Sequence, residues 1–154
     1  MENGKLQKTR VSVFYYSKSG NTKKIADAIA EEMGVSAVQA GDVGKGYDMK
    51  KCDLLFVGSG NYAKKAGKEM ISFLETLLPA DGKTAAVFGT AGGSGKEQLE
   101  EMKKILQRKG IKVLGDWTCL GQEYSLKNMG HPDEEDCVSA RKFSKRILKK
   151  IEII

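Results

Sequence analysis

Near the amino end, a short polar turn carries residue types suited to binding a phosphate group. Its residues are Ser17, Lys18, Ser19, Gly20, Asn21 and Thr22. The turn follows the apolar run Val11–Tyr16 and precedes Ile25, Ile29 and Met33, which recur at helical spacing. A turn between a strand and a helix offers unpaired backbone N–H groups and the positive end of the helix dipole, and here hydroxyl groups as well. This set of donors predicts a phosphate site.

The spacing of the turn does not fit the two common nucleotide-binding loops. It has no second glycine and no Gly-Lys-Ser/Thr ending, so it is not a P-loop, and it lacks the two-glycine spacing of the dinucleotide fold. It resembles instead the Ser/Thr-x-Ser/Thr-Gly-Asn-Thr loop of flavodoxins, which holds the phosphate of FMN. The alternative is an ordinary helix start in which Ser19, Asn21 or Thr22 only caps the first turn.

Length and composition indicate a single domain without a metal site. A chain of 154 residues can bury a full core, and we expect one domain over residues 1–154 with its core at about 11–151. No apolar run is long enough to cross a membrane, and the first residues lack the apolar core of a secretion signal. Three scattered cysteines favour free thiols and a cytoplasmic location over a disulfide framework or a metal knuckle.

The net charge of +6 raises the question of a nucleic-acid partner. Most lysines and arginines, however, fall in rows along the predicted helices, as in residues 141–150, where solvated polar faces are expected. We therefore expect no nucleic-acid partner and no membrane partner.

Apolar patterns predict a strict alternation of strands and helices. Strands are expected at residues 11–16, 35–40, 54–57, 84–88 and 111–118. Helices are expected after the polar turn, at 70–78 before Pro79, from about 99 to 106 before Gly110, and from Pro132 to Ile151. Residues 41–51 are expected to form a glycine-rich loop. The alternation predicts an α/β fold with a doubly wound, five-stranded parallel sheet and helices on both faces.

The resemblance to flavodoxins covers residues 11–151. It implies the strand order 2-1-3-4-5, with FMN at the switch point between strands one and three. It assigns hydroxyl or amide donors for the FMN phosphate to Ser17, Ser19, Asn21 and Thr22. The backbone N–H groups of Lys18, Gly20 and Asn21 are implied to point to the same phosphate. The ammonium of Lys18 either pairs with the phosphate or extends into water.

The loop after the third strand is expected to pack on the FMN ring. By the resemblance, its cofactor-binding residues are Ser59, Gly60, Asn61, Tyr62 and Ala63. Tyr62 is the candidate for stacking on the ring, and the alternative is a tyrosine packed under its own loop. In the family a glycine often lets the peptide beside the ring flip, because glycine reaches positive φ freely. No glycine follows Tyr62, so the peptide that would flip is left open.

The loop after the fourth strand is rich in glycine, which lets backbone N–H groups approach a flat ligand. The resemblance assigns ring contacts to Gly89, Thr90, Ala91, Gly92 and Gly93. The alternative is a plain turn followed by a helix start at Ser94. No second aromatic residue stands here, so Trp117, Tyr124 or no residue covers the other face of the ring.

Two residues toward the carboxyl end invite a functional interpretation. Cys119 lies near the carboxyl edge of the predicted sheet, where it either approaches the flavin or, the favoured interpretation, is a small buried residue. His131, the only histidine, precedes a proline at a helix start. A role in the helix entry is favoured for it over proton transfer.

The resemblance implies an FMN-binding protein that acts as a low-potential electron carrier. Such a protein needs no catalytic residues of its own, and none is assigned. Its partners would be redox proteins, namely a reductase and an electron acceptor. We expect a monomer or a weak dimer.

The main alternative is an enzyme of the same fold, because one fold can serve several activities. It would be an NAD(P)H-dependent FMN or quinone reductase, or another flavodoxin-like oxidoreductase such as a dehydrogenase of porphyrin precursors. Lys64, Lys65 and Lys68 favour this alternative, because they flank the expected flavin and can receive an anionic substrate. A flavin-free interaction domain is the third interpretation, and the intact polar turn argues against it.

Overall fold

Strands and helices alternate along the chain, as the sequence predicts. The computed structural model describes residues 8–93, 96–121 and 129–152. The strands are β1 (Val11–Tyr16), β2 (Ala37–Gln39), β3 (Leu54–Gly60), β4 (Thr84–Ala91) and β5 (Lys112–Leu120). The helices are α1 (Asn21–Met33), α2 (Ala40–Val43), the 3-10 helix η2 (Met49–Lys51), α3 (Lys68–Glu75), α4 (Glu97–Arg108) and α5 (Glu134–Glu152). Within these described ranges, no helix combines the length and the apolar character needed to cross a membrane.

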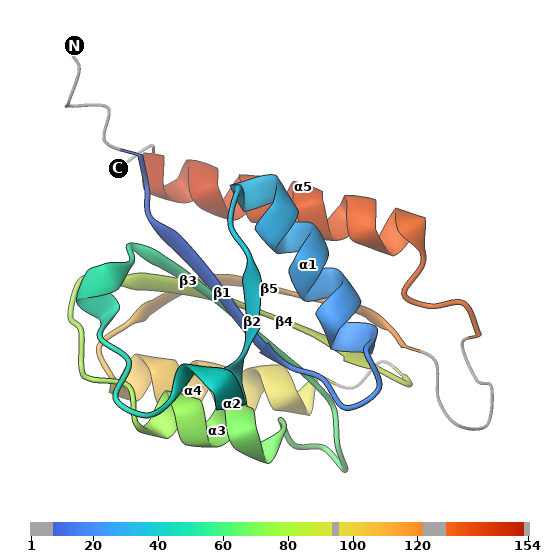
Figure 1. Cartoon of the computed structure of the whole chain (residues 1–154), viewed down its shortest axis with the longest axis horizontal. Coiled ribbons are helices and arrows are strands. Elements are labelled where there is room, and N and C mark those ends of the chain that lie inside the picture. The colour runs from blue at the N-terminus through green and yellow to red at the C-terminus, as the bar shows by residue number, and fades with distance from the viewer. Residues whose placement is uncertain (1–7, 94–95, 122–128, 153–154) are drawn as a thin grey trace.

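The five strands form one parallel sheet in the order β2-β1-β3-β4-β5 (Figure 1). This confirms the predicted doubly wound sheet and its strand order. The helix that follows β1 packs on one face of the sheet, and the helix that follows β3 packs on the other. The chain therefore diverges to opposite faces between these two neighbouring strands, which is the topological switch point of the sheet.

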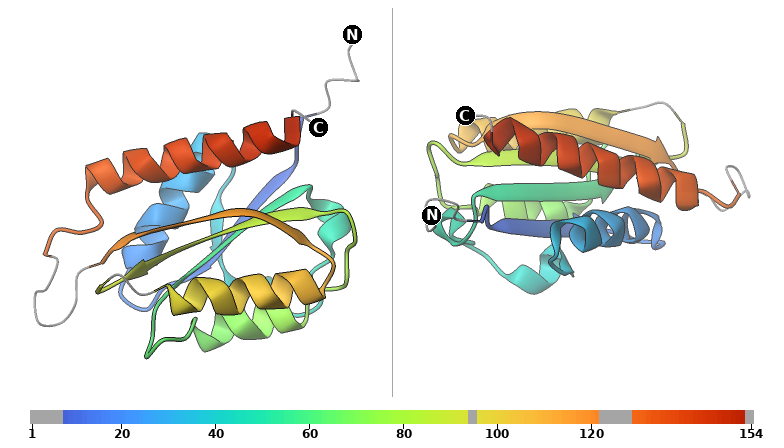
Figure 2. Two further views of the ribbon diagram at one scale, coloured as in Figure 1. Left: turned by 180° about the vertical axis from the view of Figure 1, so that it is seen from behind. Right: turned by 90° about the horizontal axis from the view of Figure 1, so that it is seen from above.

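Helices cover both faces of the sheet, with α1 and α5 on one side and α3 and α4 on the other (Figures 1 and 2). The central strand β3 is buried along its whole length. Leu54 and Phe56 join the apolar cluster under α1 and α5, whereas Leu55 and Val57 join the cluster under α3 and α4. Because successive side chains of a strand point to opposite faces, one strand supplies both cores.

The buried faces of the helices follow the predicted spacing. In α1 the buried residues include Ile25, Ile29 and Met33. In α5, Phe143 and Ile147 are buried on the same side of the sheet. The apolar sides of these two amphipathic helices therefore cover one face of the sheet.

Helix α4 ends where the sequence predicts, just before Gly110. This glycine has a φ of +79°, a left-handed conformation that glycine adopts without a Cβ clash. Its N–H donates to the carbonyl of Gln107, and the N–H of Ile111 donates to the carbonyl of Leu106, each at 3.1 Å. The pair of bonds is a Schellman motif, which satisfies the last carbonyl groups of the helix.

The third and fourth strands are longer than predicted. Gly58 and Gly89 were expected to end them, but the pairing continues to Gly60 in β3 and to Ala91 in β4. A Cβ at Gly58 would lie 2.1 Å from the ring of Phe88, so this glycine makes room for a side chain of the neighbouring strand. Part of the site that was expected in loops therefore lies at strand ends, namely Ser59, Gly60, Gly89, Thr90 and Ala91.

The second strand is shorter than predicted, and short helices occupy the expected loop. Only Ala37–Gln39 pairs with β1. Val35 instead follows the cap of α1, which ends at Met33, and its N–H donates to the helix carbonyl of Ala30 at 2.9 Å. Ala40 begins α2, and η2 follows before β3, so the prediction of a plain loop over residues 41–51 was wrong.

Helix α3 ends at Glu75, three residues before the predicted end. Leu78 is 48% exposed, and its N–H donates to the carbonyl of Tyr47 at 3.4 Å. Pro79 follows, and the residue before a proline is disfavoured in the helical conformation. The apolar spacing at Leu78 is therefore not part of the buried helix face.

Candidate functional site

The carboxyl ends of β1, β3 and β4 meet at one edge of the sheet (Figure 1). The register pairs Tyr16 with Ser59 and Gly60 with Thr90, so the three strand ends are level. Residues 17–20 follow β1 and are called the polar turn below, and residues 61–67 form the loop between β3 and α3. The topology thus brings the predicted phosphate and ring segments together.

The polar turn leads into α1 through a glycine. Gly20 is the N-cap residue, with a φ of +97°, and its carbonyl accepts the N–H of Lys24 at 3.1 Å. The N–H of Gly20 donates to Ser17 Oγ at 2.9 Å. Because the cap position holds a glycine, no side chain at that position closes the amino end of α1. Lys18 and Ser19 are exposed, so the turn is open to a ligand.

Two buried threonines connect α1 to β4. Thr22 Oγ1 and Thr90 Oγ1 lie 2.9 Å apart, and the residues are 1% and 4% exposed. The carbonyl of Thr90 accepts the N–H of Asn61 at 3.1 Å. It also accepts the side-chain Nε2 of Gln98 at 3.4 Å. Thr90 therefore links the amino end of α1, the end of β3 and the start of α4.

The loop after β3 begins with a tight two-residue turn. The N–H of Tyr62 donates to the carbonyl of Lys65 at 2.7 Å, and the reverse bond measures 3.1 Å. The two central residues, Ala63 and Lys64, have φ values of +53° and +70°. Positive φ at both central positions is typical of a type I′ turn, which usually holds asparagine and glycine. Neither residue is a glycine, so the turn stores backbone strain.

The side chain of Tyr62 leans from this loop toward the polar turn. Its phenol oxygen accepts the backbone N–H of Lys18 at 3.1 Å, and its ring packs edge-on against Tyr16. A Cβ at Gly60 would lie 2.8 Å from the phenol oxygen, so the ring passes close over that glycine. Burial raises the pKa of Tyr62, which keeps the phenol protonated.

Three side-chain amide oxygens are buried near this edge, and two of them belong to residues that the sequence does not mark as site residues. The carbonyl oxygens of Gln39, Asn61 and Gln98 have no hydrogen-bond partner within the described residues. The nitrogen of Gln39 donates to the carbonyl of Ser17 at 3.4 Å. Gln39 and Gln98 carry no sequence signal, because only the strand order and the start of α4 bring them to this edge.

Charges of both signs stand beside the loop after β3. Lys64, Lys65 and Lys68 are exposed. Asn61 donates to the carboxylate of Glu97 at 3.1 Å. Hydrogen bonds from the backbone N–H of Glu97 itself and from Asn61 lower the pKa of that carboxyl, and the charge of Lys64 acts in the same direction. Lys64 is therefore close enough to the Glu97 carboxylate for their charges to interact.

Ser59 holds the end of β3 against the start of α3. Its hydroxyl is fully buried, accepts the N–H of Gly67 at 2.8 Å and donates to the carbonyl of Gly60 at 2.9 Å. The hydroxyl hydrogen of Ser59 is therefore already bound to an acceptor of the chain itself, the carbonyl of Gly60. If Ser59 contacts a ligand, we expect its backbone groups and not its hydroxyl to make the contact.

Trp117 and Cys119 lie in β5 at the side of this edge. The indole N–H of Trp117 donates to Ser139 Oγ at 3.1 Å, and its ring stacks on Phe143, so it is held against α5. Burial raises the pKa of the Cys119 thiol to about 12, so the thiolate is not formed near neutral pH. Tyr124 and Ser94, which the sequence analysis named, lie outside the described residues.

His131 is hydrogen-bonded to a residue in the first turn of α5. Its Nδ1 lies 2.8 Å from Asp136 Oδ2. The same carboxylate accepts the N–H of Asp133 at 2.8 Å, and the carboxylate of Asp133 accepts the N–H of Asp136 at 2.9 Å. These reciprocal bonds form a capping box at the helix start. The geometry favours the helix-entry role of His131.

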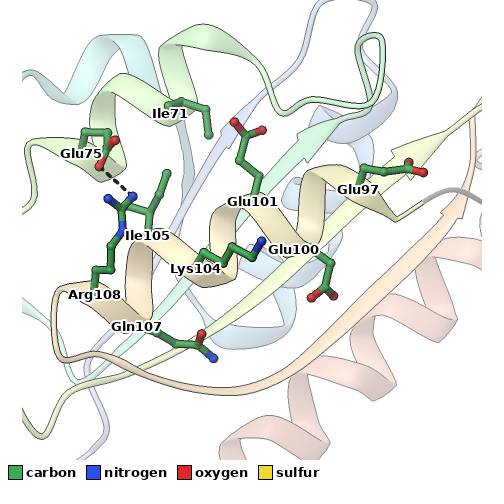
Figure 3. Close-up of a pocket in the computed structure, with 9 residues that line it drawn as sticks. All are labelled: Ile71, Glu75, Glu97, Glu100, Glu101, Lys104, Ile105, Gln107 and Arg108. Carbon is green, nitrogen blue, oxygen red and sulfur yellow. Dashed lines mark hydrogen bonds and ion pairs between the residues drawn. The ribbon is translucent and has the colours of Figure 1, made fainter.

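The groove in Figure 3 lies between α3 and α4 and has a volume of about 870 Å³. Six of its nine lining residues are charged, and Glu75 pairs with Arg108 at 3.4 Å. Its glutamates on α4 precede Lys104 and Arg108, an order that the helix dipole favours. It includes none of the predicted site residues, and we interpret it as a solvated helix face.

Comparison with known proteins points to one family. Residues 12–129 match the family model described as flavodoxin domain. An uncharacterized protein of Methanocaldococcus jannaschii is 32% identical over 138 residues, which cover 84% of this chain and 91% of that protein. A flavodoxin of Klebsiella pneumoniae is 26% identical over 138 residues, which cover 83% of this chain and 78% of that protein.

The fold is also found among solved structures. Oxidised flavodoxin 1 of Bacillus cereus superposes with a TM-score of 0.74 at 20% identity. The superposition covers 90% of this chain and 97% of that chain. At this identity the likeness shows a shared fold.

Proposed function

Because this chain belongs to the flavodoxin domain family, we propose that it binds FMN and acts as a low-potential electron carrier between redox proteins. The polar turn at the amino end of α1 is the observation that carries the proposal. It stands at the edge of the sheet where the chain diverges between β1 and β3. Helix amino ends bind phosphate through backbone N–H groups and the helix dipole, and such an edge is where α/β sheets bind ligands.

The residues of the turn fit a phosphate group. The positive φ of Gly20 turns the backbone sharply into α1 without a capping side chain. Lys18 and Ser19 are exposed beside it, and the buried Thr22–Thr90 pair holds a hydroxyl hydrogen that the pair itself does not use. We assign the phosphate to Ser17, Lys18, Ser19, Gly20, Asn21 and Thr22.

We assign the flat ring of FMN to the ends of β3 and β4 and the segments that follow them. Tyr62 supports this assignment, because its aromatic ring already lies at this edge over a glycine backbone. The proposed contacts are Ser59, Gly60, Asn61, Tyr62, Ala63, Gly89, Thr90, Ala91, Gly92 and Gly93. FMN, when bound, supplies one-electron transfer, and the chain binds it, orients it and limits water access.

Neither His131 nor Cys119 is arranged as a catalytic group, which favours a carrier over an enzyme. His131 is bound to Asp136 at the entry of α5. The raised pKa of Cys119 leaves it without a nucleophilic thiolate. We propose that the chain forms one domain, works as a monomer or weak dimer, and exchanges electrons with a reductase and an acceptor protein.

The second candidate is a reductase that oxidises NADH or NADPH directly. The exposed lysines of the loop after β3 favour it, because these nucleotides are anionic. The charge of Glu97 beside Lys64 works against it. Direct turnover of a nicotinamide nucleotide separates the two functions.

The test is a pair of measurements on the full chain. The apoprotein is titrated with FMN and with riboflavin, which lacks the phosphate, and flavin fluorescence reports binding. We expect FMN to bind at least about a hundredfold more tightly, because several charge-assisted hydrogen bonds are lost with the phosphate. Equal affinity for the two flavins would overturn the phosphate assignment. Rapid oxidation of NADPH without an added reductase would favour the enzyme over the carrier.

A further inference from the structure

We propose that Thr90 is a positioning residue for the phosphate of FMN, and that it acts by orienting the hydroxyl group of Thr22. The inference rests on the proposed function. It states how α1 and β4, which are far apart in the chain, both contribute to binding the phosphate. Thr90 stands in β4, among the segments assigned to the flavin ring, whereas Thr22 stands in the first turn of α1. Their hydroxyl oxygens lie 2.9 Å apart.

The two hydroxyl groups bring two hydrogens to a contact that uses only one of them. Each threonine hydroxyl has one hydrogen to donate, and a single hydrogen lies between two hydrogen-bonded oxygens. Both residues are at least nine-tenths buried, and neither hydroxyl has another hydrogen-bond partner within the described residues. One hydrogen of the pair is therefore left without an acceptor. A buried polar hydrogen without an acceptor is unfavourable, so the pair is ready to donate to a third group.

The position of the two residues decides which hydrogen is left over when phosphate binds. Thr22 is the second residue of α1, directly after the polar turn and Asn21. The first turn of a helix is where the helix dipole attracts an anion. A phosphate there accepts from Thr22. Thr22 then accepts from Thr90, so the hydrogen bonds run from Thr90 through Thr22 to the phosphate.

The backbone of Thr90 is well anchored for this role. Its carbonyl accepts hydrogen bonds from the N–H of Asn61 at 3.1 Å and from the side chain of Gln98 at 3.4 Å. Thr90 is also paired with Gly60 in the neighbouring strand β3. The hydroxyl of Thr90 is therefore presented from a fixed strand. Without it, the hydroxyl of Thr22 has no partner that sets its direction.

The experiment compares FMN with riboflavin in variants of Thr90. Apoproteins with Thr90→Val and Thr90→Ser are titrated with both flavins. Valine keeps the shape of threonine and removes the hydroxyl, whereas serine keeps the hydroxyl. We expect Thr90→Val to bind FMN about five- to tenfold more weakly and riboflavin with an affinity within about twofold of wild type. Thr90→Ser should return the FMN affinity to within about twofold.

Two controls separate positioning from a general loss of structure. Thr84→Val makes the same change in the same strand, but the hydroxyl of Thr84 donates to the carbonyl of Asp53 at 2.7 Å, at the opposite edge of the sheet. Its affinity for FMN should match wild type. In the double variant Thr22→Val/Thr90→Val, FMN should bind no more weakly than in Thr22→Val alone, because Thr90 acts only through Thr22.

Each outcome bears on one claim. Equal weakening of FMN and riboflavin in Thr90→Val overturns the inference, because the effect would then lie on the ring side. Additive losses in the double variant overturn it as well. Unchanged FMN affinity in Thr90→Val overturns it while leaving the proposed function intact. If the wild-type protein binds neither flavin, that result overturns both the proposed function and the inference about Thr90.

Discussion

The phenol oxygen of Tyr62 accepts a hydrogen bond from the backbone N–H of Lys18 at 3.1 Å. The contact joins the loop after β3 to the polar turn. The ring of Tyr62 also packs edge to face against Tyr16, the last residue of β1, with centroids 5.7 Å apart. The N–H of Lys18 is also one of the donors that we assign to the FMN phosphate. Phosphate and phenol therefore compete for one donor.

This competition predicts tighter FMN binding when the phenol oxygen is removed. Tyr62→Phe keeps the aromatic ring for stacking, but the phosphate no longer has to displace the phenol at Lys18. The lost protein hydrogen bond corresponds to about 0.5–1 kcal/mol, so the dissociation constant for FMN should fall about two- to fivefold. Titration of the apoprotein with FMN and with riboflavin measures this, and the riboflavin affinity should not change.

Tyr16→Phe is the matched control for that variant. Tyr16 lies beside Tyr62, and its hydroxyl has no hydrogen bond within the described part of the chain. It should leave the FMN affinity unchanged. Weaker FMN binding in Tyr62→Phe would mean that the phenol oxygen contacts FMN rather than competing with it.

The strained turn after β3 predicts that a glycine substitution stabilises the chain. Lys64 has a φ of +70°, and a left-handed conformation costs an ordinary residue about 1–2 kcal/mol. Glycine at this position avoids that cost. Its greater conformational freedom in the unfolded chain, however, lowers the free energy of unfolding by about 0.5–1 kcal/mol. Lys64→Gly should therefore raise the free energy of unfolding by about 0.5 kcal/mol, as measured by urea denaturation.

The neighbouring residue Lys65 provides the control, because its φ is not positive. Lys65→Gly removes the same charge and the same side-chain type, but gains nothing from relieved strain. It should lower the free energy of unfolding by about 0.5–1 kcal/mol. If both variants are destabilised equally, the backbone of Lys64 is not strained in solution.

The parallel sheet and the polar turn were predictable because they rest on local patterns, whereas the strand order was implied only by the resemblance to flavodoxins. Hydroxyl residues and one glycine at fixed spacing between an apolar strand and a helix define the phosphate-binding pattern at residues 17–22, which includes the polar turn. The alternation of short apolar runs with helical periods defines the parallel sheet. These signals need no knowledge of which residues touch.

The lengths of the strands were not predictable in the same way, because a glycine has opposite meanings in different surroundings. Gly110 ends a helix, as expected from its left-handed conformation. Gly58 instead lies inside β3, where the ring of Phe88 fills the space that a side chain would need. Only the register between β3 and β4, which pairs Gly58 with Phe88, distinguishes the two cases.

The contacts inside the site depend on register for the same reason. Thr22 and Thr90 are far apart in the sequence, and their pairing follows from the placement of α1 against the end of β4. The amide of Gln98 reaches Thr90 because α4 starts beside that strand end. A sequence pattern names donors and acceptors, but only the packed sheet decides which of them meet.

The helix entry at His131 predicts a pH dependence of stability. The hydrogen bond to Asp136 raises the pKa of His131 above its ordinary value of 6.5, and the charges of Asp136, Asp133 and Glu135 act in the same direction. The folded chain therefore favours the protonated imidazole. The stabilisation is complete below the unfolded pKa and is lost as the pH rises through the higher folded pKa.

The measurement compares wild type with His131→Gln in urea unfolding at several pH values from about 5.5 to 8.5. Wild type should be the more stable at low pH, and its advantage should shrink as the pH rises. His131 is the only histidine, so few other groups titrate in this range. A difference between the two proteins that stays constant with pH would show that protonation of His131 is not linked to folding.

The lysines beside Tyr62 predict the direction of a shift in the reduction potential of bound FMN. Reduced FMN is an anion, so nearby cations favour it. A lysine ~10 Å away through an effective dielectric of roughly 40–80 contributes about 0.4–0.8 kcal/mol. For one electron this corresponds to about 20–35 mV per charge.

Replacing Lys64, Lys65 and Lys68 together by glutamine should therefore lower the second one-electron potential of bound FMN by about 60–100 mV at low salt. Potentiometric titration of the FMN-loaded protein measures this, and added salt should shrink the shift because it screens exposed charges. In the control variant, Lys142, Lys145 and Lys149 of α5 are replaced by glutamine. These lysines are also exposed, and their replacement removes the same total charge. That variant should shift the potential by much less, because the effect depends on distance from the flavin. Equal shifts in the two variants would mean that only net charge matters, and a null shift in both would place the first three lysines away from the flavin.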